Sequence, residues 1–256
     1  MFTRFYISIL FVFCVQQSVA FSQDSSLSIQ TGSFSISHTS VEILGQEMAT
    51  SYNDMLDQNE QVSYEIYVPT NYDPNKPSGI MVYISPQDSI KTPNGWMDIM
   101  EQNNLIWIAA TQSGNKVMAG KRVLMAVMAL PLLQKNYAIN GNRIYVSGLS
   151  GGGRVASIVA MQYPNMFKGG IYNCGSNFWG DQTPLQIDLI KQNRFVFITG
   201  SEDFNLEDTK SVRRKYRKAG VENTKLMVIQ RMGHQNPNRR KFMQAIEYLD
   251  ENKAIN

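Results

Sequence analysis

Apolar residues recur along the chain with spacings typical of strands and of helices. Over residues 61–69 the apolar side chains occupy every second position, which is the period of a half-buried strand. Elsewhere, short continuous apolar runs are bounded by turn residues, as in strands buried on both faces. We predict strands over residues 61–69, 79–85, 105–110, 143–147, 169–174, 194–199 and 225–229.

Longer segments between these runs have helical character. Helices are predicted over residues 120–137, 151–162, 206–219 and 238–252, and Pro131 is expected to kink the first of them. Strands that alternate with helices indicate an α/β protein, with a mostly parallel, twisted sheet and helices on both faces. No internal repeat or low-complexity linker interrupts the pattern, so residues 61–256 are expected to form one domain.

The first residues have the pattern of a secretory signal peptide. Arg4 precedes a short apolar stretch, and Ser18 and Ala20 provide the small residues that signal peptidase reads. We predict that residues 1–20 are removed and that the mature protein lies outside the cytoplasm, secreted or periplasmic. An uncleaved anchor is the alternative, although the apolar run is short for a membrane span. Residues 21–60 are expected to form an N-terminal leader and edge element.

Composition and charge narrow the class of protein. The 256-residue chain is 43% hydrophobic and carries a formal net charge of +3, which excludes disorder as its main state. Its basic clusters, over residues 213–218 and 239–241, fit solvated helix faces, so nucleic acid is not an expected partner. Cys174 is the one cysteine left after residues 1–20 are removed. With 2 histidines in the chain, we expect no metal site.

One motif carries most of the chemical information, Gly-Leu-Ser-Gly-Gly over residues 148–152. It has the form G-x-S-x-G and joins a predicted strand to a predicted helix, where a sharp turn exposes the serine hydroxyl. Ser150 is therefore the candidate nucleophile, and the Gly151 amide is a candidate donor to a developing oxyanion. Glycine-rich turns also bind phosphate, but neither the lysine of a P-loop nor the spacing of a dinucleotide-binding turn follows here.

A serine nucleophile needs a base and an orienting acid, expected in the order Ser, acid, His for this type of sheet. His234 follows a predicted strand and is the candidate base, whereas His38 precedes the predicted sheet and is expected at the surface. Asp203, a few residues beyond another strand, is the candidate acid, and Glu202 is its rival. A second interpretation makes Asp203 or Asn205 the cap of the helix that begins at residue 206.

At these residues the chain resembles the α/β-hydrolase superfamily. Residues 144–153, with Tyr163-Pro164 and Phe167, are most similar to secreted esterases and polyhydroxybutyrate-depolymerase-like enzymes, a group that includes feruloyl and acetyl-xylan esterases. Asp203 and His234 match that group's acid and base positions. The resemblance covers residues 60–250 and implies the α/β-hydrolase fold and cleavage of carboxylic esters through an acyl-serine intermediate, with no cofactor.

The loop after the second predicted strand departs from this family. The superfamily often has His-Gly there, whereas this chain has Ser85-Pro86-Gln87. Because Pro86 has no amide hydrogen to donate, Gln87 is the candidate for the second backbone donor of the oxyanion hole.

Two aromatic residues are candidates for substrate contacts. Phe178 and Trp179 follow a strand end and are expected either to line the cleft or to pack in the core. Cys174, at the same strand end, is expected to be a buried small residue.

The leading hypothesis is thus a secreted serine esterase that acts on a small-molecule or polymer ester, with no membrane partner after signal cleavage. A peptidase or amidase on the same scaffold and a non-catalytic binding protein are the alternatives. The sequence leaves acetyl, feruloyl, butyryl and polyester substrates open.

Overall fold

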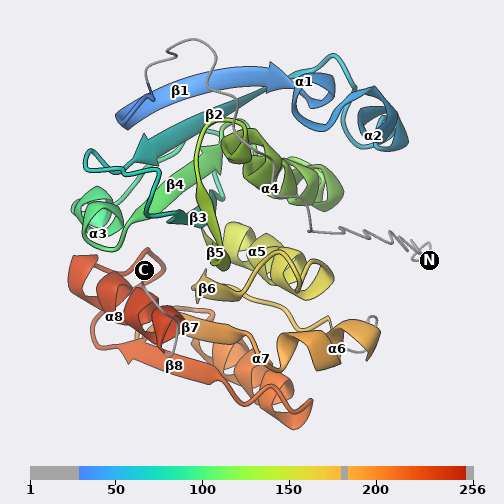
Figure 1. The fold of residues 1–256 in the computed structure, drawn as a ribbon. Helices are drawn as coiled ribbons and strands as arrows, with labels where there is room; N and C mark the ends of the chain where they lie inside the picture. Colours follow the sequence, from blue (N-terminus) through green and yellow to red (C-terminus); the bar gives the residue numbers. More distant parts are fainter. Residues whose placement is uncertain (1–28, 180–183, 252–256) are drawn as a thin grey trace.

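One eight-stranded sheet runs through the part of the chain that the structure, a computed structural model, describes, residues 29–179 and 184–251 (Figure 1). Its strand order is β1-β2-β4-β3-β5-β6-β7-β8. Strand β2 pairs antiparallel with β1 and β4, and the remaining neighbours pair in parallel. The strands are β1 (Gly32–Thr39), β2 (Gln61–Val68), β3 (Ser78–Ile84), β4 (Leu105–Ala110), β5 (Ile139–Leu149), β6 (Gly169–Asn173), β7 (Arg194–Gly200) and β8 (Thr224–Ile229).

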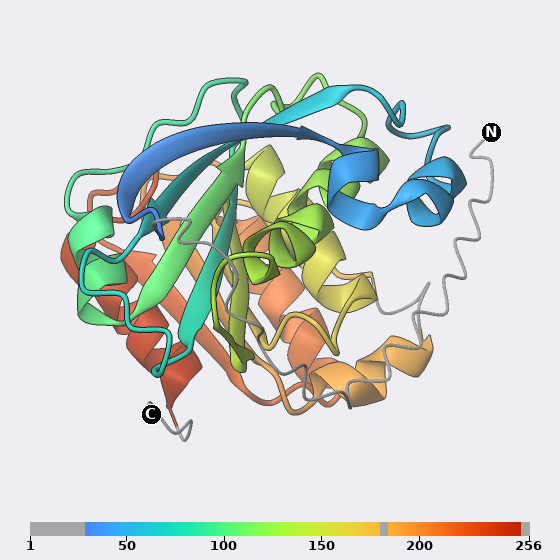
Figure 2. The same cartoon turned by 45° about the horizontal axis from the view of Figure 1, so that its top comes forward.

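Helices cover both faces of this sheet (Figures 1 and 2). Helices α4, α5 and α7 lie on one face, and α3 and α8 lie on the other. The helices are α1 (Ser40–Leu44), α2 (Gln46–Ser51), α3 (Trp96–Gln102), α4 (Ala119–Gln134), α5 (Gly151–Gln162), α6 (Pro184–Ile190), α7 (Leu206–Lys218) and α8 (Arg239–Asp250). This arrangement is the predicted α/β architecture.

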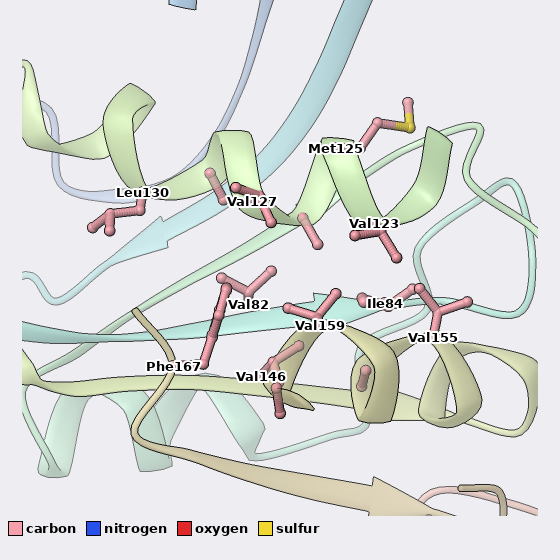
Figure 3. Packing of buried hydrophobic residues seen from close by; sticks show 14 of the residues in the cluster. Val82, Ile84, Val123, Met125, Val127, Leu130, Val146, Val155, Val159 and Phe167 are labelled. Carbon is pink, nitrogen blue, oxygen red and sulfur yellow. The ribbon is translucent and has the colours of Figure 1, made fainter. Parts of the chain in front are cut away.

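The larger core lies between the sheet and helices α4, α5 and α7. In Figure 3, Val127 of α4 and Val159 of α5 pack around Val82 of β3 and Val146 of β5. Burial of such side chains is the main force that holds the helices on the sheet. Helix α5 begins directly after the turn at the C-terminal end of β5.

The smaller core lies under α3 and α8 and anchors the loop that joins β8 to α8. Trp96 of α3 stacks on Phe242 of α8, with ring centroids 3.6 Å apart. The Trp96 indole nitrogen donates to the carbonyl oxygen of Pro237 at 3.2 Å. The segment between β8 and α8 is thereby attached to the core close to residue 234.

The strands and helices predicted over residues 61–252 are confirmed, with bounds that differ by a few residues. The expectation for His38 is wrong in one respect, because His38 lies within strand β1 and pairs with Val62 rather than preceding the sheet. Helices α1, α2, α3 and α6 were not predicted, since each is too short to display a clear period. Helix α4 continues through Pro131 to Gln134.

The predicted signal peptide, residues 1–20, lies outside the described residues. Among the residues that are described, no helix is long and apolar enough to cross a membrane.

Candidate active site

Ser150, Asp203 and His234 follow the C-terminal ends of β5, β7 and β8 respectively. These strands belong to the parallel part of the sheet, so their C-terminal ends lie along one edge. In open α/β sheets this edge is where ligands bind. The topology thus gathers the three predicted residues at the edge expected of a site.

Ser150 occupies a strained turn between β5 and α5. Its backbone angles are φ 56° and ψ −120°, in a region that residues other than glycine rarely adopt. The turn is tight enough that a Cβ on Gly148 would lie 2.4 Å from the carbonyl carbon of Gly152. Glycine is therefore required on both sides of the serine, as the G-x-S-x-G motif predicted.

Asp203 and His234 form a hydrogen-bonded pair. Nδ1 of His234 lies 2.8 Å from Oδ1 of Asp203, which leaves Nε2 as the nitrogen that can accept a proton. Thr199 donates to Oδ2 of the same carboxylate at 2.7 Å. The exposed Glu202, the rival acid, has no such contact among the described residues. Asn205 takes the N-cap position of α7, so Asp203 is not the cap.

The surroundings of Asp203 favour its charged form. Burial opposes the charge, but hydrogen bonds from the Asn205 amide, the Cys174 thiol, His234 and Thr199 outweigh it, and the pKa of the carboxyl group is lowered. A carboxylate that stays ionised can stabilise an imidazolium on His234 and fix its orientation. This is the property that the acid of a triad needs.

Cys174 connects the pair to the serine turn. Ser150 donates its amide to the carbonyl oxygen of Asn173 at 2.8 Å, directly before Cys174. The side-chain ligand atoms of Cys174, Asp203 and His234 all lie within 4.8 Å of one another. Among the described residues, however, the Ser150 hydroxyl forms no hydrogen bond with His234. Such contacts are often long before substrate binds.

The thiol is as buried as the sequence predicted. Cys174 is 0% exposed, and burial, with the nearby Asp203, raises its pKa to about 12. A thiol this weakly acidic is a poor nucleophile, because nucleophilic attack needs the thiolate. The thiol of Cys174 lies 3.3 Å from the carbonyl oxygen of Gln235 and also close to Asp203, so it is suited to donating its S–H hydrogen within the loop that carries His234.

Solved structures with the same architecture include several hydrolases. A feruloyl esterase module from Clostridium thermocellum, complexed with sinapinate, aligns with 90% of this chain and 96% of its own length, with a TM-score of 0.59 and 14% identity. The chain has the α/β-hydrolase fold. A thermostable esterase aligns with a TM-score of 0.58 and 17% identity over 75% of this chain and 60% of its own.

A peptidase shares the fold as well. Porphyromonas gingivalis dipeptidyl peptidase 4 aligns with 76% of this chain, with a TM-score of 0.56 and 15% identity, but this chain spans only 34% of that protein. The sequence itself matches no protein-family model and no curated protein.

Within this α/β-hydrolase fold, the two predicted oxyanion donors differ in availability. Gly151 is the first residue of α5, where backbone amides have no intrahelical acceptor. The Gln87 amide instead donates to Oγ of Ser85 at 3.0 Å, within its own loop. Gln87 remains a prediction as a donor, and this internal hydrogen bond would have to break for it to bind an oxyanion.

The two predicted aromatic residues pack against the larger core. Phe178 and Trp179 both contact the buried cluster beneath α5 and α7, and Phe178 meets the buried ring of Tyr216 edge-on, with centroids 5.4 Å apart. These contacts favour the packing interpretation, while a role in the cleft stays a prediction.

Sequence reasoning missed an aromatic residue at the site itself. Phe204 is 79% exposed and stacks on the imidazole of His234, with centroids 4.1 Å apart and planes at 21°. Its one sequence signal is that it directly follows the candidate acid. An exposed aromatic ring on the candidate base is well placed to contact a substrate.

Proposed function

We propose that this protein is a secreted serine hydrolase that cleaves carboxylic esters. The observation that carries the proposal is the coexistence of a strained, glycine-flanked Ser150 and an Asp203–His234 hydrogen bond at one edge of an α/β-hydrolase sheet. Structural or merely ligand-binding roles need neither the strained serine nor an ionised acid behind a histidine. No cofactor is required for the chemistry.

The mechanism follows from the positions of these groups. Nε2 of His234 takes the proton of the Ser150 hydroxyl as Oγ attacks the ester carbonyl carbon, and the Gly151 amide donates to the resulting oxyanion. The imidazolium then gives its proton to the departing alcohol, leaving an acyl-serine. Water, deprotonated by His234, attacks this acyl group, and Ser150 recovers its proton as the acid leaves. Asp203 orients the ring throughout.

Two experiments test the proposal. A fluorophosphonate probe should label the protein at Ser150, and Ser150→Ala should abolish the labelling. Paired assays on p-nitrophenyl esters and on peptide anilides should then give turnover on the esters. Turnover confined to the anilides would identify a peptidase, and absence of labelling with absence of turnover would support a non-catalytic protein.

The exposed ring of Phe204 supports esters with an aryl group as the substrate class. Phe204 offers a stacking surface beside the reacting atoms, which favours aryl groups over acetyl groups. A panel of acetyl, butyryl, feruloyl and polyester substrates should rank the feruloyl ester first by kcat/KM. Secretion is tested separately, since the exported protein should begin near Phe21 and not at Met1 when its N-terminus is sequenced.

A further inference from the structure

The loop that follows β4 reaches the serine turn and is joined to the loop that follows β3. The amide of Asn115 donates to the carbonyl oxygen of Pro86 at 3.0 Å. The amide of Gly114 donates to Oδ1 of Asp88 at 3.0 Å. Two loops that start at neighbouring strands are thus held together above the C-terminal edge of the sheet.

The side chain of Asn115 lies directly beside Gly151. A Cβ added to Gly151 would be 2.1 Å from Oδ1 and 3.0 Å from Nδ2 of Asn115, so the amide group fills the space that a side chain would take. Asn115 is nevertheless exposed. An amide that touches the first residue after the nucleophile and also faces solvent is accessible to a substrate.

A buried arginine sets the orientation of this amide. Arg122 of α4 is 4% exposed and donates from one nitrogen to the carbonyl oxygen of Ser85 at 2.8 Å. Its other terminal nitrogen lies 3.4 Å from Oδ1 of Asn115. Since a guanidinium group can only donate, the Asn115 atom that faces it must be the oxygen. The NH₂ group therefore points elsewhere, and Nδ2 has no hydrogen-bond partner among the described residues.

The backbone donor predicted for this position is already engaged, because the Gln87 amide donates to Ser85. We propose that Nδ2 of Asn115 donates to the carbonyl oxygen of the ester as it becomes an oxyanion, next to the Gly151 amide, and that Arg122 is the residue that positions it. This inference rests on the proposed ester hydrolysis, and makes Asn115 a catalytic residue supplied by the loop after β4.

The test compares Asn115→Ala and Asn115→Asp with Lys116→Ala, an exposed neighbour. Loss of one oxyanion donor lowers kcat by about 10²-fold, so Asn115→Ala should do so while KM for the same ester changes little. Asn115→Asp should lose at least as much, because its carboxylate can still face Arg122 but cannot donate. Lys116→Ala should keep wild-type kcat. Thermal unfolding of each variant checks that the fold is intact, and Asn115→Asp serves if the alanine variant does not fold.

A second readout separates this role from a structural one. An aryl boronic acid forms a tetrahedral adduct with the serine, so Asn115→Ala should weaken its binding by about the same factor as kcat, with little change for the product acid. A kcat equal to that of Lys116→Ala, or a rise in KM alone, would overturn the assignment of Asn115 and leave the esterase proposal standing. A wild-type protein that neither turns over esters nor reacts with fluorophosphonate would overturn both.

Discussion

The middle of strand β5 and its C-terminal end use polar residues in opposite ways. In the middle of the strand, Arg143 and Tyr145 are buried, and both bond Asp250 of α8, at 2.8–2.9 Å from the guanidinium and 2.6 Å from the hydroxyl. Directly after the C-terminal end, Ser150 has a strained backbone and a hydroxyl with no hydrogen-bond partner among the described residues. The middle of the strand satisfies its polar groups within the fold, and the C-terminal end leaves a hydroxyl available.

The acids beside these two parts of the molecule, Asp250 and Asp203, differ in the same way. Asp250 is paired with Arg143, which is 1% exposed and stays charged at any ordinary pH. Asp203 is paired with His234, which is 23% exposed and can gain or lose a proton. A permanent cation suits a structural ion pair, whereas a titratable ring suits proton transfer. In the proposed function, the Arg143–Asp250 pair serves folding and the His234–Asp203 pair serves proton transfer.

The strongest test of this contrast compares Ser150 with Tyr145 of β5. Ser150→Ala should reduce ester turnover by roughly 10⁶-fold without loss of stability, because it removes only the reactive oxygen. Tyr145→Phe should keep kcat and lower the free energy of unfolding by roughly 1.5–3 kcal/mol, since it removes a buried hydrogen bond to the charged Asp250. Initial rates and urea unfolding measure the two effects. Substantial turnover by Ser150→Ala would exclude Ser150 as the nucleophile.

The next largest difference in activity is expected between alanine variants of the two histidines, His234 and His38. His234→Ala should lower kcat by roughly 10⁵- to 10⁶-fold, because it removes the group proposed to accept the serine proton. His38 lies on the edge strand β1, with its ring 3.7 Å from the exposed Glu42 of α1, and should tolerate alanine with wild-type kcat. Steady-state rates on one p-nitrophenyl ester compare them directly, and the reverse pattern would mean that the base is wrongly assigned.

The same substitution at the two acids should lower activity at Asp203 and lower stability at Asp250. Asp203→Asn should lower kcat by about 10⁴-fold and leave the fold intact, because the amide favours the wrong tautomer of His234. Asp250→Asn should leave the buried Arg143 without its counter-charge, cost roughly 3 kcal/mol of stability or more, and keep kcat in the folded fraction. Glu202→Gln is the control and should change neither. Similar losses of stability in both variants would contradict the distinction.

The pH dependence of stability should separate Asp203 further. Its pKa is lowered by folding, so its ionised form stabilises the native state above the ordinary pKa of about 4, and this contribution is lost as pH falls below that value. As pH is lowered from 5, the free energy of unfolding should therefore fall less for Asp203→Asn than for the wild type. Unfolding curves at a series of acidic pH values measure the difference.

The sequence predicted those parts of the fold and of the candidate site that depend on residues close together in the chain. The apolar runs of β3, β4 and β7 and the glycines around Ser150 act within a few residues, so the fold and the sharp turn at Ser150 were predictable. Strand β1 lies in the segment expected to be a leader and edge element, but it was not predicted as a strand, because Phe34 and Ile36 are too few apolar residues to establish a period. Asn115 and Phe204 could not be found, because loops far apart in the sequence bring them to Ser150 and His234.

The smallest expected effect concerns the aromatic rings near the site. Phe204 is exposed on His234, whereas Trp179 packs against the larger core. Phe204→Ala should raise KM for feruloyl esters by about 2- to 10-fold, the size of one aromatic contact, and leave KM for acetyl esters unchanged. Trp179→Ala should instead lower the melting temperature and affect both esters equally. If Trp179→Ala were selective for the feruloyl ester and Phe204→Ala were not, the substrate would lie against the loop after β6, and the exposed ring would have no part in binding.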